Sequence, residues 1–144
     1  MVDTSVAEAW EDGSTAVVAL QLDDRLYVAN VGDAECVLAA RETDNDDRLE
    51  ATCVSIKHKP TDESERERVQ GAGGFVIFGR VGGTLAVSRA FGDRPFKVPF
   101  SKTLGDLVSA DPFTATVRLE DKHRLLLVAC DGKNVMNKKN SFSI

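Results

Sequence analysis

Short apolar segments separated by turn residues are the feature that most constrains the fold of this chain. Residues 14–20 and 25–31 are rich in β-branched and aromatic side chains, and the Asp23-Asp24 pair between them predicts an antiparallel hairpin. Apolar groups stand on both faces of the 25–31 segment, which predicts a strand covered on both sides. Similar runs predict four more strands, at residues 35–40, 51–56, 114–119 and 124–130.

One helix is predicted directly after the Lys-His-Lys-Pro sequence at 57–60. Thr61 is a suitable N-cap, Asp62 and Glu63 fall in the first turn, and the pattern ends at Gly71 or at glycines 73–74. Residues 2–10 have the spacing of a second, short helix. Residues 94–109 contain two prolines and predict an irregular surface segment. Many antiparallel strands with few helices predict an α+β fold built on a β-sandwich.

Composition limits the classes of partner. The chain has 144 residues, enough for one domain with a real core, and a net charge of −5. Nucleic acids and anionic membranes are therefore not expected as partners. The longest apolar runs are too short to span a bilayer, and the first residues do not resemble a signal peptide, so we expect an intracellular protein, cytoplasmic or nuclear.

The three cysteines do not have the spacing of a zinc site or a disulfide scaffold. Cys36, Cys53 and Cys130 each lie in an apolar, strand-like context. We therefore expect three small buried thiols in a reducing compartment.

Two aspartates are the candidate metal ligands. Asp131 follows the apolar run 125–130 and precedes Gly132, so a strand would carry its carboxylate to a sharp turn. Hard cations such as Mg²⁺ and Mn²⁺ prefer oxygen ligands of this kind. Asp33 has a similar setting after Gly32. Both positions are also compatible with ordinary turns, in the case of Asp33 a hairpin turn.

The two histidines give little support to a histidine-dependent active site. His58 precedes the predicted helix, where a solvated or loop-bonding side chain is expected, and His123 lies in a charged turn. No Ser/His/Asp spacing predicts a hydrolase triad, and the glycines of residues 79–93 match neither the dinucleotide-binding nor the P-loop pattern.

Six segments stand out by their order along the chain. They are GSTA (13–16), ANVGD (29–33), HKP (58–60), ERERVQGAGG (65–74), GRVGGTLAVSRAFGD (79–93) and LLLVACDG (125–132). In this order they resemble the metal-dependent protein serine/threonine phosphatases of type 2C. The resemblance covers residues from about 11 to 132, and the tail 133–144 diverges, so residues 1–144 are interpreted as one partial phosphatase-like domain. An unrelated ligand-binding sandwich is a remote alternative.

The resemblance implies two stacked antiparallel sheets flanked by helices, incomplete at both ends in this chain. It also implies a binuclear Mg²⁺ or Mn²⁺ centre at one end of the sandwich. Asp131 matches an aspartate that binds this centre, and Asp33 matches the aspartate of a third, weaker metal position. The SRAFGD turn, with Arg89 and Asp93, is expected to be a structural support. No catalytic or substrate-binding residue is assigned.

The chain also departs from the pattern of that family. A DGHGG-type motif, an upstream phosphate-binding arginine and a late Asp-Asn motif are not found, and Asn134 stands where an acidic residue is expected. One carboxylate of the binuclear set cannot hold two divalent cations, because Mg²⁺ needs more anionic ligands. We therefore expect the central part of a phosphatase domain, with little or no activity alone.

Two functional hypotheses follow. In the first, the parent protein hydrolyses phosphoserine and phosphothreonine in phosphoproteins through a metal-activated water. In the second, the chain is a non-catalytic, pseudophosphatase-like binding or regulatory module. The oligomeric state stays open, although unpaired strand edges would favour self-association.

Overall fold

A computed structural model describes residues 11–41, 48–130 and 141–143. The predicted helix at 2–10 and the polar loop at 42–47 lie outside the described residues. Within them the chain forms two compact units. One, here called the helical unit, contains residues 11–15 and 58–111. The other, the sandwich unit, contains the described residues of 16–57 and 112–144.

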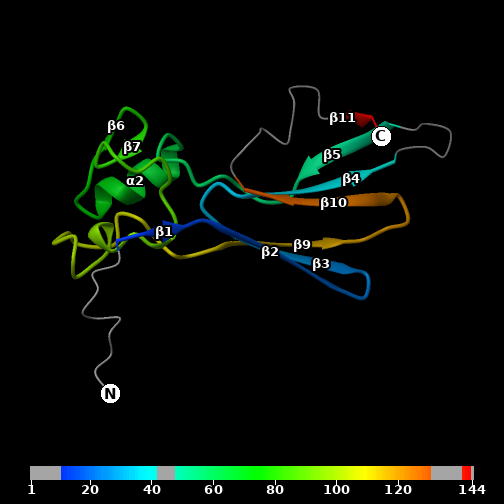
Figure 1. Ribbon diagram of the computed structural model, residues 1–144, viewed down its shortest axis with the longest axis horizontal. Coiled ribbons are helices and arrows are strands. Elements are labelled where there is room, and N and C mark those ends of the chain that lie inside the picture. The colour runs from blue at the N-terminus through cyan, green and yellow to red at the C-terminus, as the bar shows by residue number, and fades with distance from the viewer. Residues whose placement is uncertain (1–10, 42–47, 131–140, 144) are drawn as a thin grey trace, which may run out of the picture. The chain divides into compact units, whose positions relative to one another are not determined.

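The sandwich unit consists of two antiparallel sheets (Figure 1). The three-stranded sheet has the order β2–β3–β9 and the four-stranded sheet the order β10–β4–β5–β11. Their strands are β2 (Ala16–Leu22), β3 (Arg25–Val31), β4 (Glu35–Ala40), β5 (Arg48–Cys53), β9 (Phe113–Arg118), β10 (His123–Ala129) and β11 (Ser141–Ser143). The predicted antiparallel sandwich is therefore confirmed.

The two sheets pack on each other through the alternate side chains of consecutive strands. Leu26 and Val28 of β3 form a buried cluster with Cys36 and Leu38 of β4, and none of the four is more than 6% exposed. Successive side chains of a strand point to opposite faces, so one face of each strand supplies this core. Removing these groups from water is the main favourable term in joining the sheets.

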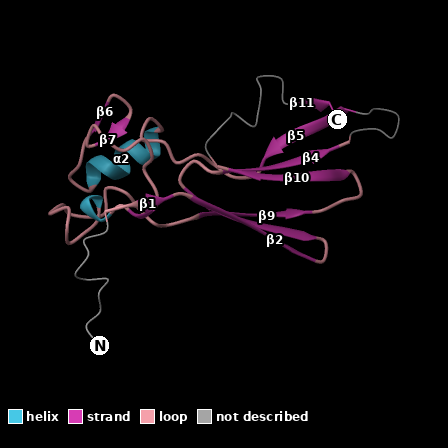
Figure 2. Cartoon of the chain, in the orientation of Figure 1, coloured by secondary structure: helices cyan, strands magenta, loops and turns pink. Residues whose placement is uncertain are grey.

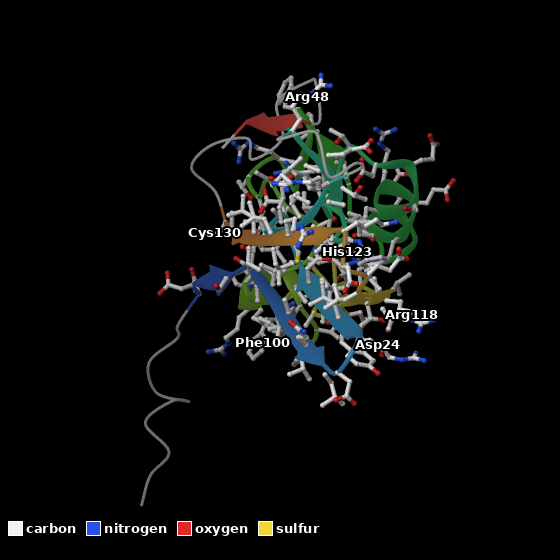
Figure 3. The ribbon with its side chains drawn as sticks, turned by 90° about the vertical axis from the view of Figure 1, so that its right-hand side faces the viewer. Asp24, Arg48, Phe100, Arg118, His123 and Cys130 are labelled. Carbon is white, nitrogen blue, oxygen red and sulfur yellow. The ribbon has the colours of Figure 1, made fainter. Side chains whose placement is uncertain are left out.

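The first predicted hairpin is confirmed. Strands β2 and β3 pair from Ala16 with Val31 to Leu22 with Arg25, and Asp23 adopts a left-handed conformation (φ 52°) in the turn. Beside this turn, the Arg118 Nε atom lies 3.0 Å from Asp24 Oδ2 (Figure 3). Both side chains are exposed, so this ion pair contributes little to stability.

The outer face of the β2–β3–β9 sheet is apolar and open in the part of the chain that the structure describes. Val18, Leu20 and Leu22 of β2 are 59–61% exposed, and Tyr27 of β3 is 39% exposed. The prediction that the 25–31 strand is covered on both faces is therefore wrong for the described residues. Apolar side chains do lie on both faces of this strand, but the sequence pattern does not show whether another element covers the outer face.

The fourth predicted strand lies three residues earlier than expected, at Arg48–Cys53. After Val54, whose N–H still donates to the Cys36 carbonyl (2.8 Å), hydrogen bonds that involve side chains replace the strand pairing at residues 55 and 56. The Cys36 N–H donates to Ser55 Oγ (2.8 Å), and the Asn30 side-chain amide donates to the Ile56 carbonyl (2.6 Å). The strand was predicted to extend to residue 56 because residues 54–56 still include the apolar side chains Val54 and Ile56.

The helical unit is built around α2 (Glu63–Gly71), the α-helix among the described residues (Figure 2). Asp62, rather than the predicted Thr61, is the N-cap residue. The helix ends at Gly71, the first of the two predicted ends, and Ala72 rather than a glycine is the C-cap residue. Short strand pairs and one 3₁₀ turn complete the unit: β1 (Gly13–Ser14) with β8 (Phe91–Gly92), β6 (Val76–Ile77) with β7 (Arg80–Val81), and η1 (Arg94–Phe96). Its core consists of Val69, Val81, Val87, Ala90 and Val108.

The segment 94–109 is irregular, as predicted, but it is not only a surface loop. Val108 is fully buried in the core of the helical unit. Lys97 is anchored as well, because its ammonium donates hydrogen bonds to the carbonyls of Ala90 and Val108. The described residues include no helix long and apolar enough to cross a membrane.

The cysteine prediction is only partly correct. Cys36 is buried, whereas Cys53 and Cys130 are exposed. Cys53 is the last residue of β5, and Cys130 follows the end of β10. These two thiols are exposed because they lie at or just beyond the end of a strand, even though the sequence around them is apolar.

Truncating the inter-sheet core should destabilise the protein far more than truncating the open sheet face. Leu26 is 1% exposed and Leu20 is 59% exposed, so Leu20→Ala is a matched control for Leu26→Ala. We expect Leu26→Ala to lower the free energy of unfolding by about 2–5 kcal/mol, and Leu20→Ala by less than about 0.5 kcal/mol, in urea denaturation. Equal losses would contradict the assignment of Leu26 to the core.

Thiol reactivity should separate the three cysteines. Burial raises the pKa of the Cys36 thiol, and the nearby Cys53 raises it further, so Cys36 is both covered and a poor nucleophile. An aromatic disulfide reagent should modify two thiols in the native protein and the third only after denaturation. In Cys36→Ala the native count should remain two. Rapid modification of all three native thiols would contradict the buried position of Cys36.

Candidate functional site

Asp33 lies where the chain crosses from one sheet of the sandwich to the other. Strand β3 belongs to the three-stranded sheet and β4 to the four-stranded sheet. The hairpin interpretation of this turn is therefore wrong, since consecutive strands that enter different sheets do not pair. Gly32 has φ 87°, a conformation that glycine adopts without strain. Asp33 follows it at 8% exposure, a buried carboxyl at one end of the sandwich.

Asn30 holds this crossing in place. Its side-chain amide donates to the carbonyls of Gly32 (3.3 Å) and Ile56 (2.6 Å), and its Oδ1 accepts the Ile56 N–H (3.3 Å). Asn30 is 1% exposed, so these bonds are shielded from competing water. The turn before Asp33 and the segment after β5 are therefore fixed to each other.

The predicted ligand Asp131 lies outside the described residues. The described strand before it, β10, pairs with β4 so that Ala129 is opposite Glu35. The end of β10 is thus placed beside the segment that follows Asp33. Among the described residues, no group of three or more His, Cys, Asp or Glu side chains could hold a metal ion.

Glu35 and Lys57 form an ion pair that the sequence analysis did not predict. Lys57 Nζ lies 2.8 Å from Glu35 Oε1, and Glu35 is 9% exposed. The hydrogen bond to Glu35 raises the pKa of Lys57 against the opposing effect of burial, and the charges of Glu35 and Asp33 raise it further. In the sequence, Glu35 stands out only as an acidic residue at the start of an apolar strand, and this position does not indicate that Lys57 is its partner.

These residues do not by themselves fit a two-metal centre. Asp33 offers an oxygen ligand of the type that Mg²⁺ and Mn²⁺ prefer. Glu35 is the other carboxylate of this segment, and it is already bound by the Lys57 ammonium. The described residues of this segment therefore do not form a metal site, and the ligand role of Asp33 stays a prediction.

The histidines have structural positions. Of the two states predicted for His58, solvated or loop-bonding, the 1% exposure of the residue rules out the solvated one. The backbone carbonyl of His58 accepts the Ser88 N–H (3.0 Å). His123 at the start of β10 (Figure 3) accepts the Glu120 N–H on Nδ1 at 2.9 Å. This bond within the predicted turn supports a local role for His123.

The helical unit brings two of the sequence motifs together. Strand β1 of the GSTA segment pairs with β8 of the 79–93 segment, with Gly13 opposite Gly92. Gly92 has φ 69°, and a Cβ atom there would lie 2.2 Å from the Asp12 carbonyl oxygen, so only glycine fits at that position. Asp93 itself has φ 52° and its N–H donates to the Asp12 carbonyl (3.0 Å). The glycines thus permit a close approach of two backbones.

Arg89 of the same motif is a structural support, as predicted. Its guanidinium donates to Glu65 Oε1 from Nη2 (2.6 Å) and Nε (3.0 Å). Arg68 donates to Glu65 Oε2 from Nη2 (3.2 Å) and also binds the Ser88 carbonyl (2.7 Å). Glu65 is 5% exposed, so one buried carboxylate joins helix α2 to the 88–89 segment.

The pKa of Glu65 reflects this network. Burial by itself would raise the pKa, but the hydrogen bonds from Arg89 and the charges of Arg68 and Arg89 outweigh it and lower the pKa from 4.5 to about 2. Because the folded value is depressed, the stabilisation is present above about pH 4.5 and is lost as the pH falls towards 2.

Replacing Glu65 should therefore have a pH-dependent effect. A pKa lowered from 4.5 to about 2 corresponds to about 3 kcal/mol at neutral pH. We expect Glu65→Gln to lower the free energy of unfolding by about this amount at pH 7, because two arginines lose their counter-charge. The difference from wild type should narrow as the pH falls from about 5 to 2.5 in urea titrations followed by circular dichroism. The exposed Glu67→Gln is the control, and parallel pH curves for Glu65→Gln and wild type would contradict this role.

Comparisons with known proteins identify the family. The family model described as "Protein phosphatase 2C" matches residues 1–143. The chain is 44% identical over 121 residues to probable protein phosphatase 2C 60 of Arabidopsis thaliana, covering 83% of this chain and 32% of that protein. It is 40% identical over 120 residues to protein phosphatase 2C homolog 3 of Schizosaccharomyces pombe, covering 83% of this chain and 27% of that protein. The chain thus spans about a third or less of these relatives.

Solved structures agree with the fold. A sex-determining protein of Caenorhabditis elegans superimposes with a TM-score of 0.71 at 36% identity, covering 88% of this chain and 29% of that chain. A serine-threonine phosphatase 2C of Toxoplasma gondii has a TM-score of 0.69 at 23% identity, covering 87% and 43%, and this likeness bears on the fold alone. On the match of the family model across residues 1–143, the chain belongs to the protein phosphatase 2C family.

Proposed function

We propose that this chain is part of an enzyme that removes phosphate from phosphoserine and phosphothreonine in proteins. The observation that carries this proposal is the family match over residues 1–143, together with 40–44% identity to relatives named protein phosphatases. The net charge of −5 supports a protein substrate over a nucleic acid, since the chain has no general attraction for polyanions.

We further propose that the enzyme depends on Mg²⁺ or Mn²⁺, with Asp131 and Asp33 among the ligands. The support for Asp33 is its buried position at the sheet crossing, and for Asp131 its place in the sequence motif after β10. When bound, such metals lower the pKa of a hydrolytic water and neutralise charge on the phosphate oxygens. The contribution of this chain would be to hold carboxylates rigidly at the end of a packed sandwich.

The 144-residue chain by itself is proposed to have little or no activity. Two divalent cations bring four positive charges, whereas Asp131, the carboxylate proposed for the binuclear set, brings one negative charge, and Asp33 is proposed for a third, weaker position. The Lys57 ammonium beside Glu35 adds a further positive charge at the Asp33 end. The same ion pair favours the second candidate function, a non-catalytic binding module that uses the sandwich as a scaffold.

Two assays separate these proposals. The 144-residue chain, with Mn²⁺ and a phosphothreonine peptide, should show no turnover above its Asp131→Ala variant. The product of the complete native gene should hydrolyse the peptide, and Asp131→Ala should reduce its kcat/KM by about 100-fold or more, since metal stabilisation is worth several kcal/mol.

The exposed-face variant Leu20→Ala is the control in both assays, because it leaves the candidate site unchanged. Turnover by the short chain that Asp131→Ala abolishes would contradict its inactivity. A folded complete gene product that does not hydrolyse the peptide would contradict the phosphatase proposal and favour the binding module.

A further inference from the structure

We infer that strand β2 is an open pairing edge and that two copies of this chain associate through it, with β2 of one copy antiparallel to β2 of the other. The two three-stranded sheets would then form one continuous sheet. The partner is a second copy of this chain, and the inference does not depend on the proposed function.

The backbone groups on the free side of β2 are the first support. In the described part of the chain, β2 is an end strand of its sheet and pairs with β3 alone. Leu22 pairs with Arg25 across a two-residue turn, so Leu22 and every second residue before it direct their N–H and C=O groups to β3. Val17, Ala19 and Gln21 direct theirs away from β3. Alternating donors and acceptors of this kind are the template for another strand.

The second support is that β2 lacks the features that protect sheet edges. Charges, prolines, bulges and short length normally protect an end strand. The sequence AVVALQL has neither a charge nor a proline, and its pairing with β3 runs over seven residues without a bulge. The other end strands of the two described sheets differ: β9 ends in Arg118, β10 contains Arg124 and a bulge between His123 and Leu125, and β11 has three residues. Strand β2 is therefore the least protected edge.

The third support is that β2 is complementary to itself. With Ala19 opposite Ala19 of the partner subunit, Val17 lies opposite Gln21 of the partner subunit, so all the edge-facing residues pair. The same register sets Val18 beside Leu20 of the partner subunit on the open face, where these side chains are 61% and 59% exposed in one copy. A two-fold axis through Ala19 thus pairs the backbone groups and brings apolar side chains into contact.

Charge is compatible with this arrangement. Each copy has a net charge of −5, so the copies repel one another at long range. The antiparallel pairing places the acidic Asp23-Asp24 turns of the two copies at opposite ends of the new strand pair. We therefore expect the association to strengthen as salt is added, because salt screens the net repulsion and leaves the apolar contact in place.

Removing one edge-facing N–H should prevent the association. In sedimentation equilibrium, the apparent mass of the 144-residue chain should rise towards twice the monomer mass with increasing concentration, and Ala19→Pro should stay monomeric. Proline is tolerated at this position because the missing N–H would face away from β3. Thr116→Pro is the matched control. Its partner Tyr27 directs its backbone groups to β2, so the Thr116 N–H faces the free side of β9, and this variant should still associate.

A second variant leaves the backbone of β2 intact. Leu20→Lys places two ammonium groups near the two-fold axis of the pair. Like charges at an interface cost several kcal/mol, so we expect the dissociation constant to rise by at least about 10-fold. Because Leu20 is 59% exposed, this change should not unfold the monomer, and circular dichroism checks that each variant is folded.

Amide hydrogen exchange locates the contact. The Val17, Ala19 and Gln21 amides should become protected as the protein concentration rises, and the Thr116 amide should not. A monomer at every concentration up to the solubility limit would overturn the inference, and so would a dimer that both folded β2 variants leave intact. Protection of the three β2 amides that does not change with concentration would overturn it too, because another part of the same chain would then occupy the edge.

Discussion

The crossing of the chain between two sheets at residues 32–34 is the constraint on which the sandwich unit depends. It allows the consecutive strands β3 and β4 to contribute opposite walls of one core, with Leu26 and Val28 facing Cys36 and Leu38. The crossing requires a tight turn, which Gly32 supplies with φ 87°. It also requires that buried polar groups be satisfied, and the Asn30 amide does this for the Gly32 and Ile56 backbone.

The candidate metal ligand is a consequence of the same crossing. Asp33 is buried because the turn lies at the end of the packed core. Its backbone position is restrained because the Asn30 side chain binds the carbonyl of the preceding Gly32. A carboxylate in such a place loses part of its hydration and gains strongly from a cation nearby. The protein already provides one such cation for the neighbouring Glu35, namely the ammonium of Lys57.

Among the described residues, the buried carboxylates Glu65 and Glu35 have ion-pair partners of different kinds. Glu65 receives two arginines, whose side chains are 22–27% exposed and which donate to both of its oxygens. Glu35 receives one lysine, which is 40% exposed. The planar guanidinium groups of two arginines hold the Glu65 carboxylate in a fixed geometry. The single ammonium of Lys57 is carried by a flexible side chain and holds Glu35 less rigidly. The arrangement at Glu65 suits a structural joint between helix α2 and the 88–89 segment.

The family, the helix after residue 60 and most of the strands could be predicted from the sequence, whereas the ligand roles of Asp33 and Asp131 stay predictions. Strand β4 was predicted with its observed bounds because its periodicity and flanking turns are local properties. Only the tertiary structure decided which sheet each strand joins, where β5 ends, which thiols are exposed, and how Glu35 and Glu65 are paired. These features depend on contacts such as Asn30 with Ile56 and Glu65 with Arg89. Their partners are distant in sequence and meet only when the units fold, so no local pattern encodes them.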